Sequence, residues 1–188
     1  MKEGVSYQTI NDKESTKALL LKLKDSKEFS VEVAVSDDHT ISAIAFSCKP
    51  GEAFAVTVEN EQTLNDFTSL LADETKFKIG HNIKATILAL KDYGVVVSSP
   101  LFDTMIAHYL VEPESAHDLQ TLSELYFNYR TMGDKDGEVY DRLCEHADLA
   151  LQLKGKLQPE LEKRGHSSLM RDVEMPLVQV LEFGRAHV

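Results

Sequence analysis

Apolar positions near the start of the chain recur at helical intervals. Leu19 and Leu23 lie four residues apart, and they follow Asn11 and Glu14, a pair with the spacing of a capping box. Polar residues separate these apolar positions, so the segment has one apolar face. We therefore predict an amphipathic helix over residues 12–24.

Three short segments rich in β-branched and aromatic residues follow this helix. They cover residues 28–35, 41–47 and 53–58, and the first places apolar residues at every second position. The connections between them are short and carry turn residues such as Pro50 and Gly51. Because such connections cannot hold a crossover helix, we predict an antiparallel three-stranded meander.

From residue 61 the apolar period is helical again, and a short strand is expected over residues 76–80. Asn82 is predicted to cap a helix that ends near Gly94, and residues 95–97 are predicted to form a fifth strand. This alternation of helices and strands indicates crossover strands added to the meander. The expected fold class is α/β, with a mixed sheet flanked by helices.

The rest of the chain has a helical pattern. The predicted segments are a helix capped by Asp103, a helix opened by Asp118, a polar loop over 131–137, a long helix over 138–163 that Pro159 should kink or interrupt, and a final helix over 170–183.

Composition is consistent with one domain over residues 1–188, because 188 residues with 43% hydrophobic content can bury one sizeable core. No apolar run is long enough to cross a bilayer, the N-terminus has no signal-peptide pattern, and Cys48 and Cys144 lie far apart. We expect a soluble cytoplasmic protein without membrane contact, monomeric as an isolated domain. The formal net charge of −11 argues against tight unaided DNA binding.

Four segments carry a specific pattern in order and spacing: FSVEVAV at 29–35, IGHNIK at 79–84, FDTM at 102–105 and ADLALQL at 147–153. Together they resemble the 3′–5′ exonuclease domain of the polymerase I family (family A DNA polymerases), which has a ribonuclease H-like fold. The resemblance implies a sheet of three antiparallel strands and two crossover strands. It also implies that residues 170–188 begin the connection to a polymerase domain in the same chain.

The family binds two divalent cations with four carboxylates, and the resemblance maps each position onto this chain. The Asp-x-Glu pair of the first strand becomes Glu32 and Ala34, and the Asp that follows Asn-x-Lys becomes Thr86. The last Asp becomes His146, and the Tyr four residues before it becomes Arg142. One carboxylate remains and a fixed cation has been added, so no metal is expected to bind and Glu32 is the only retained ligand candidate.

Other polar residues receive structural interpretations, with functional ones kept open. Asn82 and Lys84 could contact a nucleic-acid phosphate, although capping and surface solvation are favoured. A buried Glu32 needs a partner, and we predict an ion pair with Arg142. The acids Asp37, Asp38, Asp92, Glu145 and Asp148 are not expected to replace the lost ligands, and Asp103 is assigned to a cap. Solvated or capping roles are expected for six further histidines: His39, His81, His108, His117, His166 and His187.

Three functions remain open from the sequence. The favoured one is a catalytically inactive exonuclease-like domain that serves as a structural scaffold for its polymerase domain in DNA replication and repair, reaching DNA only through that polymerase. The alternative is an active 3′–5′ proofreading exonuclease that uses Mg²⁺ or Mn²⁺ on single-stranded ends. The third is a separate protein-interaction module, consistent with the acidic charge.

Overall fold

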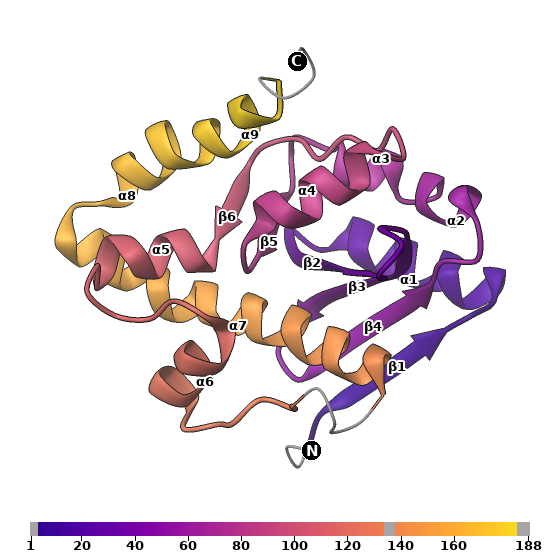
Figure 1. The fold of residues 1–188 in the computed structure, drawn as a ribbon, viewed down its shortest axis with the longest axis horizontal. Helices are drawn as coiled ribbons and strands as arrows, with labels where there is room; N and C mark the ends of the chain where they lie inside the picture. Colours follow the sequence, from indigo (N-terminus) through magenta and orange to yellow (C-terminus); the bar gives the residue numbers. More distant parts are fainter. Residues whose placement is uncertain (1–3, 134–137, 184–188) are drawn as a thin grey trace.

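A mixed six-stranded sheet forms the centre of the computed structural model, which describes residues 4–133 and 138–183 (Figure 1). The strands lie in the order β1-β4-β3-β2-β5-β6. Strands β2, β3 and β4 pair antiparallel, which confirms the predicted meander, and β5 and β6 add in parallel beyond β2. The strands are β1 Ser6–Ile10, β2 Glu28–Val35, β3 Ile41–Lys49, β4 Glu52–Thr57, β5 Phe77–Gly80 and β6 Leu101–Asp103.

Two strand assignments made from the sequence need correction. Strand β1 was not predicted, because it is a short edge strand in which only Ile10 is buried, so it has no marked alternation. The predicted strand over 95–97 is wrong. Val95 and Val97 are buried while Val96 is 62% exposed, which imitates strand alternation in an irregular connection. Parallel pairing with β5 begins only at Leu101.

The helices follow the predicted order with changed limits. They are α1 Lys13–Asp25, α2 Glu61–Asn65, α3 Thr68–Leu71, α4 Ile83–Lys91, α5 Thr104–Val111, α6 Leu119–Phe127, α7 Val139–Arg164, α8 Ser167–Leu169, the π-helical turn η1 Met170–Glu174, and α9 Met175–Phe183. Asp12, not Asn11, caps α1 by accepting from the backbone N–H groups of Glu14 and Ser15. No helix in the described part of the chain is long and apolar enough to cross a membrane.

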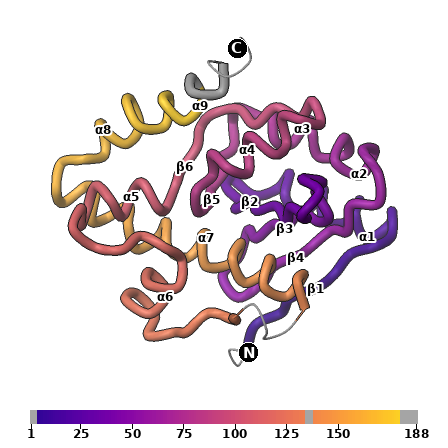
Figure 2. Tube along the Cα trace, in the orientation of Figure 1, coloured from indigo at the N-terminus to yellow at the C-terminus, as the bar shows by residue number. Residues whose placement is uncertain are grey.

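Of the kink or interruption predicted at Pro159, the interruption is wrong, because helix α7 continues through this residue to Arg164. Leu157 and Leu161 on either side of Pro159 are buried, and their packing holds the last turns in place. Residues 134–137 of the predicted polar loop before this helix lie outside the described residues. Figure 2 shows α7 as one continuous segment across the molecule.

Side-chain size differs between the two faces of the meander. Ala43 and Ala45 of β3 face α7 and pack against Leu143, Cys144 and Ala147 of that helix, together with two alanines of β4. The alternate residues of the same strands, such as Ile44 and Phe46, belong to the main core. Small side chains on one face therefore let the backbone of α7 come close to the sheet, and Ser30 Oγ donates to the Ala147 carbonyl at 2.6 Å.

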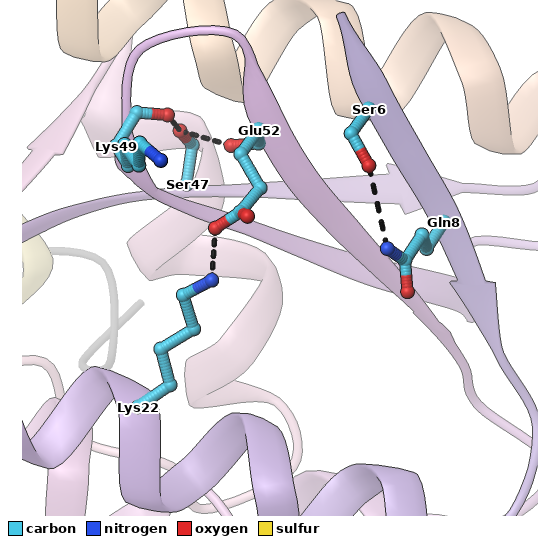
Figure 3. A network of polar contacts seen from close by, with 6 residues as sticks. All are labelled: Ser6, Gln8, Lys22, Ser47, Lys49 and Glu52. Carbon is cyan, nitrogen blue, oxygen red and sulfur yellow. Dashed lines mark hydrogen bonds and ion pairs between the residues drawn. The ribbon is translucent and has the colours of Figure 1, made fainter.

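Polar contacts fix the β3–β4 turn and the edge of the sheet (Figure 3). Ser47 Oγ lies 2.7 Å from the Glu52 carbonyl, and the Glu52 carboxylate forms an ion pair with Lys22 of α1. The buried Asp148 of α7 accepts from Tyr7 Oη at 2.9 Å and from the Gly51 N–H at 2.8 Å. One carboxylate thus joins the long helix to β1 and to the β3–β4 turn.

Asp103 caps two helices with one carboxylate. Its oxygens accept from the N–H groups of Met105 (2.8 Å) and Ile106 (3.2 Å) at the start of α5, as predicted from the sequence. They also accept from Asn82 (3.2 Å) and Ile83 (2.8 Å) at the start of α4. Because Asp103 is fully buried, these four N–H groups replace the water that its carboxylate would otherwise bind.

Replacing this carboxylate should destabilise the fold strongly. We expect Asp103→Ala to lower the free energy of unfolding by about 2–4 kcal/mol, because four backbone N–H groups at two helix starts lose their acceptor. Asp118→Ala is the matched control, since Asp118 is an exposed cap of α6 alone and should cost about 1 kcal/mol. Urea unfolding followed by circular dichroism measures both, and equal losses would contradict the double-cap role.

Candidate functional site

The turn between β5 and α4 positions the candidate site. A Cβ on Gly80 would lie 2.9 Å from Ile83 Cβ, so the close turn requires glycine. Asn82 follows in the left-handed region, with φ 58° and ψ 52°, and its side chain makes no capping bond. Asn82 thus occupies the N-cap position of α4 as predicted, but Asp103 supplies the acceptor that its own side chain does not.

Glu32 lies on the face of β2 that Ser30 presents to α7. It is 9% exposed, and its Oε1 accepts from the backbone N–H of His81 at 2.8 Å. Burial raises the pKa of Glu32 to about 8, the His81 N–H lowers it, and the nearby carboxylate of Asp103 raises it further. None of these contributions comes from a cation, so the structure gives no support to the predicted ion pair with Arg142.

His81 connects the turn to α5 and α7. Its Nδ1 lies 2.9 Å from Thr104 Oγ1, the first residue of α5. Burial lowers the pKa of His81 to about 4, and the next cause is the positive charge that His146 of α7 would carry. The ring of His81 is therefore neutral at pH 7. Glu32, His81 and His146 come together at one place, from three separate elements.

The remaining mapped positions add no carboxylate to this place. Ala34 packs against the apolar cluster of α7 that contains Leu143. Thr86 on α4 is 3% exposed and points inward with the apolar residues of that helix. Arg142 precedes His146 by four residues on α7, which places both on the same side of the helix. Lys84 lies in the first turn of α4 and is half-buried.

The other acids near these positions have structural partners. Asp38 accepts from Thr40 N–H and Thr40 Oγ1, which confirms its assignment to a turn. Glu145 is fully buried and accepts from Tyr129 Oη at 2.5 Å and Met132 N–H at 2.8 Å. Among the described residues, no group of three or more His, Cys, Asp or Glu side chains is arranged to hold a metal ion.

A pair of histidines beside the site was not foreseen as a structural feature. His108 on α5 is fully buried, and its Nδ1 lies 2.8 Å from Nδ1 of His117. Burial lowers the pKa of His108, with a further contribution from His117. A solvated role for His108 is therefore wrong. The sequence offered one indication of this burial: His108 lies one turn after Thr104 on a largely apolar helix. His187 lies outside the described residues.

A cavity in the described part of the chain lies away from these positions. It measures about 390 Å³ and lies between α7, the β5–β6 edge and the C-terminal helices, with Phe77, Phe102, Lys154 and Met170 in its wall. None of the mapped site positions lines it. Glu32 and Thr86 are instead enclosed by neighbouring side chains, so this region has the packing of a core.

Comparison with known proteins relates this geometry to DNA polymerases. DNA polymerase I of Borreliella burgdorferi is 26% identical over 204 residues, which cover 95% of this chain and 22% of that protein. DNA polymerase I of Geobacillus stearothermophilus is 28% identical over 179 residues, which cover 85% of this chain and 20% of that protein. The chain thus spans about a fifth of the length of these relatives.

Solved structures share the fold. The POL domain of Pol1 from M. smegmatis in complex with DNA primer-template and dNTP matches with a TM-score of 0.77 and 23% identity, over 94% of this chain and 31% of that one. Escherichia coli RNase D, an exoribonuclease, matches with a TM-score of 0.77 and 16% identity, over 95% of this chain and 51% of that one. Brucella melitensis NrnC with bound Mg²⁺ matches with a TM-score of 0.76 and 17% identity, over 98% of this chain and 96% of that one. Identities this low show the ribonuclease H-like exonuclease fold alone.

The environment of Glu32 predicts a pH-dependent stability. Its pKa of about 8 in the folded state exceeds the ordinary value of 4.5. The stability that the protonated carboxyl contributes to the folded state is therefore fully present below pH 4.5 and is lost as the pH rises through 8. Glu32→Gln keeps an acceptor for the His81 N–H and cannot ionise. Relative to the wild type, it should gain roughly 2–4 kcal/mol in the free energy of unfolding between pH 5 and pH 8. Urea unfolding at both pH values tests this, and parallel curves would refute it.

Most of the chain matches one protein family. The family model described as 3′–5′ exonuclease matches residues 7–162. This range contains all five mapped positions, Glu32, Ala34, Thr86, Arg142 and His146. Since the match covers well over half of the chain, the chain belongs to the 3′–5′ exonuclease domain family, in the form carried by bacterial DNA polymerase I.

Proposed function

We propose that this chain is an exonuclease-like domain of a DNA polymerase I that no longer cleaves DNA and serves as a structural scaffold for the polymerase domain. The observation that carries the proposal is the set of side chains at the four metal-ligand positions. These positions hold Glu32, Ala34, Thr86 and His146, where a two-metal exonuclease needs four carboxylates.

The residues present do not fit a pair of divalent cations. Mg²⁺ and Mn²⁺ prefer several ionised oxygen ligands, and here one carboxyl group remains. With a pKa of about 8, Glu32 is mostly protonated at pH 7, and its Oε1 already accepts from the His81 N–H. Arg142 adds a fixed positive charge on the same helix side as His146. No catalytic step through a metal is therefore proposed.

Features that support the fold are retained around these substitutions. Asp103 joins two helix starts, and Asp148 joins α7 to β1 and to the β3–β4 turn. Glu145 holds the segment before α7. The losses are confined to groups that a metal would need, while the groups that shape the domain remain. This pattern favours an architectural role in DNA replication and repair over general decay.

The partner and the surroundings follow from this proposal. The polymerase domain would be supplied by the same longer chain, as in the relatives of which this chain spans about a fifth. DNA would be reached through that polymerase, since a net charge of −11 gives this domain little attraction of its own for phosphates. The compartment would be the cytoplasm, and the isolated domain would be a monomer.

A degradation assay tests the loss of activity. The purified chain is incubated with a 3′-labelled single-stranded DNA and either Mg²⁺ or Mn²⁺, beside a nuclease of the same fold as positive control. We expect no metal-dependent shortening, because the cation ligands are missing. Glu32→Ala is assayed in parallel to identify contaminating nucleases, which the substitution would not affect. Metal-dependent shortening by the wild type that disappears in Glu32→Ala would refute the proposal.

A further inference from the structure

The C-terminal helical segment is apolar on two faces. Met170, Met175 and Val178 point into the domain and are only 3–4% exposed. Leu169, Val173 and Leu177, in contrast, are 37%, 45% and 46% exposed. They are named the tail stripe below. A helix with apolar residues on opposite faces is typical of a position between two packed layers, yet this domain covers only one face.

The spacing of the tail stripe makes it a continuous surface feature. Its three residues lie four apart in the sequence, so they follow one side of the segment that α8, η1 and α9 form. Exposed leucines elsewhere are isolated: Leu21 on α1 and Leu125 on α6 are each the single large apolar side chain exposed on a described helix. Single exposed residues are ordinary, whereas an ordered row on one helix marks an interaction surface.

A π-helical turn, Met170–Glu174, lies in the middle of the stripe. Such turns are rare and occur frequently at functional sites. The stripe also lies beyond residue 162, outside the range that matches the exonuclease family. Because these three residues are exposed, packing within this domain gives no reason for apolar residues on the outer side of this helix.

We propose that the tail stripe is the surface on which the polymerase domain docks. This inference rests on the proposed function and specifies its partner contact. The polymerase domain is the occupant that the comparisons favour, because the M. smegmatis polymerase chain contains this fold in only 31% of its length. With a net charge of −11, much of the remaining surface is charged and well hydrated. Burying this row of apolar side chains against a partner would therefore lower the free energy.

A binding experiment with matched variants tests the surface. The chain is mixed with the polymerase domain from the same genome and followed by sedimentation velocity, at concentrations up to about 300 µM because contacts within one chain are weak between separate molecules. Leu177→Asp should weaken the complex at least about tenfold, since it places a charge in a buried apolar contact. Leu125→Asp is the control, with a similarly exposed leucine on α6, and should change the affinity less than about twofold.

Three outcomes would overturn the docking surface. They are the absence of any complex with the wild type, equal affinities for Leu177→Asp and Leu125→Asp, and a wild-type dimer that Leu177→Asp dissociates, which would identify a second copy as the occupant. Circular dichroism confirms that both variants fold. The result is independent of the nuclease assay: a domain that trims DNA and also docks through the stripe would refute the proposed inactivity and leave this contact standing.

Discussion

The buried carboxylate of Asp103 is the interaction on which the site depends. It accepts from two N–H groups at the start of α4 and from two at the start of α5. It thereby fixes the direction that the chain takes after β5 and after β6. The β5–α4 turn carries His81, whose N–H holds Glu32 and whose ring meets Thr104. The charge of Asp103 also raises the pKa of Glu32. The side chain of Asn82 makes no capping bond, and its backbone has a left-handed conformation.

The same arrangement explains how the domain can keep its fold without metals. Four carboxylates facing one another are stable only when cations neutralise them, because like charges at short range repel. Here Ala34 and Thr86 carry no charge, a histidine stands at the fourth position, and Glu32 is enclosed with a raised pKa. The region between β2, α4 and α7 is therefore stable as a packed core. A cation would have to displace the N–H of His81 from Glu32 and would gain little charge in return.

Sequence patterns predicted the fold well where neighbouring residues alone determine the local structure, through the spacing of apolar positions or a helix cap. The meander, the long helix α7 and the Asp103 cap are examples, and the resemblance located Glu32 and His146 at one site. Contacts were missed where a residue binds a partner that is distant in the sequence. The second role of Asp103 comes from a turn about 20 residues earlier, and Asp148 binds Tyr7 and Gly51 from the other end of the chain. No local pattern contains such contacts. The predicted partner of Glu32 was a cation, whereas a backbone N–H from a neighbouring strand end binds it.

We propose that the missing carboxylates, and not a changed backbone, prevent cation binding. Calorimetric titration with Mn²⁺ tests it on the wild type and on a variant that combines Glu32→Asp, Ala34→Glu, Thr86→Asp and His146→Asp. We expect no binding to the wild type below about 1 mM and binding at least about tenfold tighter in the variant, since the ligands return to an intact backbone. Wild-type binding in the micromolar range would contradict this proposal, as would a folded variant that still binds no Mn²⁺.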